Sequence, residues 1–144
     1  MRHHLFFGLL LVCVMVGLGS CTALPPATGN AFSYASAAGG DCGVFMTLTN
    51  PSNQADTLVA VKTDVAARAE LHTMVGDMKS GMKMQQVENI PLPASGTVEL
   101  KPGSLHVMLF GLNKEMKAGD TFALTLQYES GREQSVQVQV RTKN

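Results

Sequence analysis

Short runs of alternating apolar and polar residues, separated by turn-forming residues, constrain this chain more than any other feature. The clearest runs are 122–128 and 136–140, and the second alternates valine with glutamine without a break. Because successive side chains of a strand point to opposite faces, this pattern predicts strands with one buried face. The segment Glu129–Arg132 between them contains Ser130-Gly131 and predicts a hairpin turn. No segment carries apolar residues at helical spacing over a useful length.

The same alternation recurs along the chain between turn signals such as Gly39-Gly40, Pro91 to Pro93 and Pro102-Gly103. Strands are expected at 43–49, 56–63, 66–74, 82–88, 97–100, 105–110, 122–128 and 136–140. Short strands at this spacing predict an all-β fold, an antiparallel β-sandwich of the Greek-key type. The expected inner faces carry Val59, Val61, Leu124, Leu126, Val136 and Val138.

The N-terminal residues 1–20 are interpreted as a signal peptide. A short positive start, Arg2-His3-His4, precedes an apolar run from Leu5 to Leu18, which is too short to span a bilayer but typical of a signal-peptide core. The run ends in Leu18-Gly19-Ser20-Cys21, which resembles the lipobox of bacterial lipoproteins. Lipidation of Cys21, as with a palmitate chain, would anchor the mature protein to a membrane.

An ordinary signal peptide cleaved near Ala23 or Ala27 is the alternative, and both interpretations place the domain outside the cytoplasm. The expected location is the periplasmic face of the cell envelope. The outer membrane is favoured, because Thr22 stands where an Asp would favour retention in the inner membrane.

The remainder is expected to form a flexible tether at 21–30 and a single domain at 31–144. The tether is small and rich in Pro and Gly, and 144 residues leave no room for a second domain of ordinary size. Cys42 is the one cysteine of the expected domain, so no intramolecular disulfide framework is possible. A buried thiol is expected there, with a metal-ligand role or an intermolecular disulfide as alternatives.

The charge balance and the absence of catalytic motifs argue against two classes of function, nucleic-acid binding and catalysis. Eleven basic residues balance eleven acidic residues, and charged residues make up only 15% of the chain, so nucleic acid is not expected as a partner. No acid/base pair, nucleophile beside a histidine or P-loop stands out, so the protein is not expected to be an enzyme. A monomer is expected.

Histidine and methionine form the pattern that carries chemistry. His72 and His106 are each followed two residues later by a methionine, Met74 and Met108. Residues i and i+2 of a strand point to the same face, so each pair would project side by side. Met82 and Met84 repeat this spacing in a stretch with few aliphatic residues.

The chemistry of these side chains favours reduced copper. Thioether is a soft, neutral ligand and imidazole is of borderline softness, so a Met and His cluster favours Cu(I) over zinc, iron or magnesium. The neighbouring acidic residues Glu70, Asp77 and Glu88 do not form a ligand-spaced set for zinc. The competing interpretation is that the methionines only fill gaps in the core.

Four segments carry a family resemblance: Glu70–Met74, Gly81–Val87, Ile90–Leu100 and Pro102–Leu109. They resemble the periplasmic copper chaperones called PCu(A)C over nearly all of 31–140. The signature of that family is a His, a Met about a dozen residues on, then 21 residues and a closing His-x-Met. Eleven residues separate His72 from Met84, 21 separate Met84 from His106, and Met108 closes the set.

The resemblance implies a cupredoxin-like β-sandwich that holds one Cu(I) per chain with His72, Met84, His106 and Met108. It also implies delivery of copper to a periplasmic acceptor in cytochrome oxidase assembly, either the oxidase copper site or another copper chaperone. Many members carry Met directly after the first His, where this chain has Thr73, so Met74 or Met82 is a possible auxiliary ligand. The C-terminus lacks the Met- and His-rich tail of some members, and one site is therefore expected.

Two other functions compete with a chaperone. A blue-copper electron carrier needs two His, a Cys thiolate and a weak axial Met, and Cys42 could supply the thiolate. A structural or protein-interaction lipoprotein would use its methionines only for packing.

Overall fold

The computed structural model describes residues 27–144, which form strands and turns without a helix. The signal peptide, Cys21 and most of the expected tether therefore lie outside the described residues. Residues 27–144 therefore offer no candidate for a membrane-spanning helix. The strands are β1 (Ala27–Tyr34), β2 (Cys42–Thr49), β3 (Asp56–Lys62), β4 (Ala66–Asp77), β5 (Gly81–Gln86), β6 (Ile90–Leu92), β7 (Thr97–Leu100), β8 (His106–Leu112), β9 (Thr121–Tyr128) and β10 (Glu133–Arg141).

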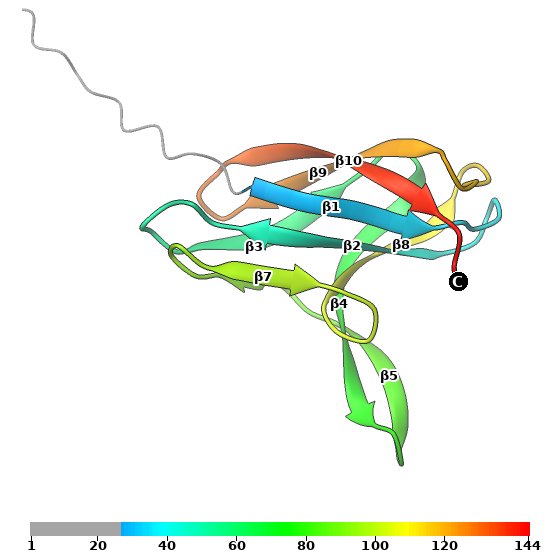
Figure 1. Cartoon of the computed structure of the whole chain (residues 1–144), viewed down its shortest axis with the longest axis horizontal. Helices are drawn as coiled ribbons and strands as arrows, with labels where there is room; N and C mark the ends of the chain where they lie inside the picture. The colour runs from blue at the N-terminus through cyan, green and yellow to red at the C-terminus, as the bar shows by residue number, and fades with distance from the viewer. Residues whose placement is uncertain (1–26) are drawn as a thin grey trace, which may run out of the picture.

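The strands form one continuous sheet that folds into a sandwich, in the order β5-β4-β8-β2-β1-β10-β9-β3-β6, with β7 paired to β2 (Figure 1). The sheet curls until β3 packs near β4. Many neighbours are not consecutive in the chain, as Greek-key connections require. The pairs are antiparallel except β1 with β10, the first and last described strands, which run parallel. The all-β expectation is confirmed.

The core lies between the two layers and is built from the alternating residues of each strand. Leu124, Leu126 and Val138 are fully buried, and Val61 and Val136 nearly so, as expected. Val59 is the exception, because 40% of it is exposed. The register of β3 against β9 shifts between Leu58 and Ala60, and this bulge turns Val59 outward while its neighbours Leu58 and Val61 point inward.

Two strands differ from the sequence expectation. β6 occupies residues expected to form a turn, although it contains Pro91; β6 is an edge strand, where the missing N–H of proline is tolerated. β1 begins at Ala27, so the expected tether at 21–30 is too long and the domain starts before residue 31. Residues 27–29 pair with 47–49 of β2 through their backbone, which requires no large side chains.

The expected hairpin of β9 and β10 is confirmed, with Gln127 opposite Glu133. A second hairpin, β4–β5, projects from the body of the sandwich (Figure 1). Gly76 in this hairpin has φ 109°, and a Cβ there would collide with the carbonyl oxygen of Gly81. Glycine therefore lets the two strands approach closely at the outer end of the hairpin.

Candidate metal centre

The predicted ligand residues gather where the β4–β5 hairpin joins the sandwich. His72 of β4 lies directly opposite His106 of β8, and the centroids of their rings are 6.0 Å apart. Met84 of β5 lies opposite Met74 of β4. The Sδ of Met84 is 3.4 Å from Nε2 of His106, so these two donor atoms already face each other.

The outer face of the sheet carries this cluster. On β8, Val107 and Leu109 are fully buried in the core, so His106 and Met108 point to the other face. Met108 lies opposite Glu70 of β4, next to the pair of histidines. The backbone thus brings all four predicted ligand residues to one face of three adjacent strands.

Met74 and Met82, the possible auxiliary residues, occupy the same hairpin. Met74 faces Met84 across the hairpin, whereas Met82 lies opposite Gly76, two residue pairs further from the histidines. Met74 is therefore the better placed of the two to act beside Met84.

Burial differs sharply between the imidazoles and the thioether of the hairpin. His72 and His106 are 6% and 5% exposed, while Met84 is 43% exposed. The ring of Phe45 lies 6.1 Å from His106 and the ring of Phe110 lies 5.7 Å from His72, so aromatic groups flank both histidines. A metal ion held here would have an apolar base and a side open to solvent.

Each imidazole uses one nitrogen in a hydrogen bond. Nδ1 of His106 is 2.8 Å from the carbonyl oxygen of Ser104. Nε2 of His72 is 2.8 Å from Oε2 of Glu70, and Nδ1 of His72 is buried without a hydrogen-bond partner. A buried, unpartnered nitrogen is costly in a folded protein unless a ligand satisfies it, so this atom fits a metal-binding role.

Glu70 contacts the cluster directly, through its hydrogen bond with His72, although the sequence pattern did not single it out as part of the site. Its position two residues before His72 on one strand was the available signal, because that spacing places both side chains on one face. The hydrogen bond from His72, aided by Arg68, holds the pKa of Glu70 below its usual value. The carboxylate is therefore charged at neutral pH.

Cys42 belongs to the core and not to this cluster. It lies opposite Leu109 and shares the inward face with that residue, away from His106 and Met108. Burial raises the pKa of its thiol. A blue-copper centre built from Cys42 and these histidines is therefore wrong for this fold, and the expectation of a buried thiol is confirmed.

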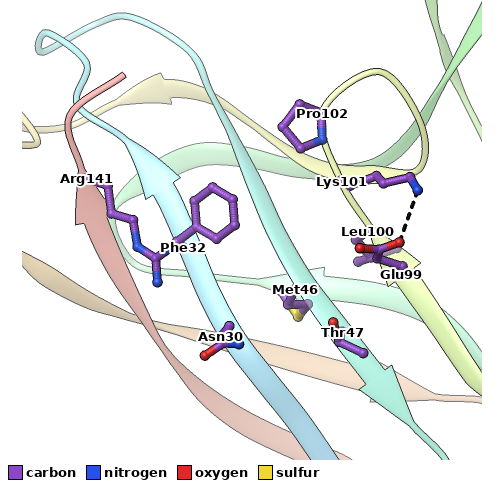
Figure 2. A pocket seen from close by; sticks show the side chains of 9 residues that line it. All are labelled: Asn30, Phe32, Met46, Thr47, Glu99, Leu100, Lys101, Pro102 and Arg141. Atoms are coloured by element: carbon purple, nitrogen blue, oxygen red, sulfur yellow. Dashed lines mark hydrogen bonds and ion pairs between the residues drawn. The ribbon is translucent and has the colours of Figure 1, made fainter. Parts of the chain in front are cut away.

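A groove of about 560 Å³ lies beside β1, β2 and β7 (Figure 2). Arg141 covers the ring of Phe32 at 4.5 Å from its centroid, and Nζ of Lys101 pairs with Glu99 at 3.0 Å. Phe32 in turn packs against Phe45. None of the predicted ligand residues lines this groove, so it is separate from the His/Met cluster.

The fold and this cluster define a class of protein: an all-β sandwich domain that presents imidazole and thioether donors at the base of a projecting hairpin. The model of the LpqE-like family, described as "Putative lipoprotein LpqE-like", matches residues 27–140. The chain belongs to this family. The resemblance to PCuAC domains inferred from the sequence motifs is confirmed by the solved structures below.

The solution structure of Cu(I)-DR1885 from Deinococcus radiodurans is 34% identical, covering 87% of this chain and 84% of that one, with a TM-score of 0.67. The copper-bound PCuAC domain from PmoF2 is 20% identical over 84% of this chain and 96% of that one, with a TM-score of 0.69, and shows the fold. "Uncharacterized protein RP573" of Rickettsia prowazekii is 30% identical over 103 residues, 70% of this chain. The chain spans 56% of the length of that relative.

Proposed function

We propose that this protein binds one Cu(I) ion as cargo, with His72, Met84, His106 and Met108 as ligands, and passes it to another protein. The observation that carries the proposal is the convergence of two opposed histidines with the Met84 thioether, where one buried imidazole nitrogen lacks a partner. Soft thioether and borderline imidazole donors match the preference of Cu(I) for soft, neutral ligands. The family relative DR1885 has been solved as its Cu(I) form, which supports the same cargo here.

The arrangement of the four ligands would also allow the copper ion to be released to an acceptor protein. All four donors are neutral, so the bound site retains the positive charge of the ion, and deep burial would be costly. The buried imidazoles provide a fixed half of the site, and the half-exposed Met84 provides an open half. An incoming ligand of an acceptor can replace a thioether there while the histidines still hold the ion.

The acceptor proposed is a copper-receiving protein of the periplasm, either the copper site of cytochrome oxidase or another copper chaperone. The protein acts as a monomer anchored to the envelope through lipid on Cys21, with the outer membrane favoured. The description of its family as lipoproteins supports this location.

Anaerobic titration with Cu(I), in competition with a chromogenic Cu(I) chelator, tests the proposed function. We expect one tight equivalent for the wild type and clear weakening in Met84→Ala and His106→Ala. Met78→Ala is the matched control, because Met78 is 96% exposed near the hairpin tip and its loss should leave the affinity unchanged. A wild type that fails to compete would overturn the copper function and leave a structural lipoprotein.

A further inference from the structure

The two histidines of the cluster form their hydrogen bonds through different ring nitrogens, His106 through Nδ1 and His72 through Nε2. A carbonyl oxygen can only accept a hydrogen bond, so the contact of His106 Nδ1 with Ser104 O places the proton on Nδ1. The lone pair of His106 is then on Nε2, the atom that faces Met84 Sδ. Backbone geometry alone therefore determines which nitrogen His106 presents.

His72 has the opposite arrangement. An ionised carboxylate also only accepts, so its contact with Nε2 of His72 at 2.8 Å places the proton on Nε2. The lone pair is left on Nδ1, the nitrogen that is buried without a partner. For His72, the Glu70 side chain therefore determines which ring nitrogen carries the proton.

Glu70 is itself held in place. Nε of Arg68 donates to its other carboxylate oxygen, Oε1. The guanidinium of Arg68 lies over the ring of Phe110, 4.5 Å from the centroid, and Phe110 also packs against His72. Arg68, Glu70 and His72 thus form a row along one face of β4, braced by Phe110 of β8.

We propose that Glu70 is a positioning residue that fixes His72 to bind copper through Nδ1, whereas His106 binds through Nε2. This inference rests on the proposed function. A carboxylate behind a metal-binding imidazole fixes its tautomer and orientation and makes it a better donor. The negative charge of Glu70 also offsets part of the charge that four neutral ligands leave on the ion.

Nitrogen-15 NMR of the protein without copper at pH 8 tests the tautomer directly. We expect the wild type to hold His72 with the proton on Nε2. Glu70→Leu removes both acceptor oxygens and should abolish this preference. Glu70→Gln keeps the shape but has one acceptor oxygen for two donors, Arg68 and His72, so the preference should weaken. The control Glu99→Leu removes an exposed carboxylate paired with Lys101, outside the cluster, and should change nothing.

Measuring the Cu(I) affinity of the same variants tests whether the Glu70 contact strengthens copper binding by His72. Loss of such a supporting partner lowers metal affinity about 10- to 100-fold, and we expect Glu70→Leu in this range with Glu70→Gln between it and the wild type. A wild-type His72 protonated on Nδ1 would overturn the inference, as would a Glu70→Leu variant with unchanged tautomer and affinity. A wild type with the Nε2–H tautomer that binds no Cu(I) would instead overturn the proposed function.

Discussion

The carboxylate of Asp56, at the start of β3, is expected to stabilise the sandwich through a network that can be tested quantitatively. Its side chain is 4% exposed and pairs with Arg132. The hydroxyl of Ser130 donates to Oδ2 over 2.8 Å, and the N–H groups of Thr57 and Ser130 donate to Oδ1 over 2.9 and 3.2 Å. The network ties β3 to the turn between β9 and β10.

The substitution Asp56→Asn removes the charge without changing the shape. Oδ1 can still accept from the two backbone N–H groups, but an NH₂ group replaces the oxygen that accepts from Arg132 and Ser130. A hydrogen bond to a charged group contributes about 1.5–3 kcal/mol. Because the Arg132 side chain is 23% exposed and can turn toward water, we expect a loss of about 2 kcal/mol, or about 8 °C in melting temperature.

The pH dependence has a definite sign. Burial by itself disfavours the charged carboxylate, but the hydrogen bonds from Arg132, Ser130 and Thr57 outweigh it and hold the pKa of Asp56 below its usual value. The contribution is therefore complete above the unfolded-state pKa of about 3.9 and is lost as the pH falls through the folded-state pKa. The stabilities of wild type and variant should converge on acidification.

Urea unfolding of both proteins at pH 7 and at low pH measures this difference. Glu88→Gln, which removes an exposed carboxylate, is the control and should match the wild type at pH 7. Equal stability of Asp56→Asn and wild type at pH 7 would refute the reasoning. A gap that stays the same at pH 2 would do so too, because it would not come from the charge.

Three further predictions concern the site and the core. Cu(I) affinity should weaken on acidification, because a protonated imidazole cannot bind the ion; a flat competition titration between pH 5 and 8 would exclude histidine ligation. Gly76→Ala should weaken Cu(I) binding by displacing the strand that carries Met84, and unchanged affinity would show that the hairpin tolerates the shift. Leu109→Ala should cost about 2–5 kcal/mol in urea unfolding through the cavity that it leaves, and a loss below 1 kcal/mol would mean that the core collapses around it.

Local patterns predicted most of the strands, because alternation along a strand reports which face is buried. The same logic predicted that His106 and Met108 share a face and that Cys42 is buried. It failed for Val59, because a bulge depends on the partner strand, and for β6, because tolerance of proline depends on an edge position that only the complete sheet defines.

The sequence by itself determined the donor types, their spacing and the faces of the strands that carry them, since these follow from side-chain chemistry and a period of two residues. Only the tertiary structure decided that β4 pairs with β8, which places His72 opposite His106. It also decided which imidazole nitrogen stays without a partner and that Met84 remains half exposed. Strand pairing joins residues distant in the chain, and local periodicity carries no information about which strands become neighbours.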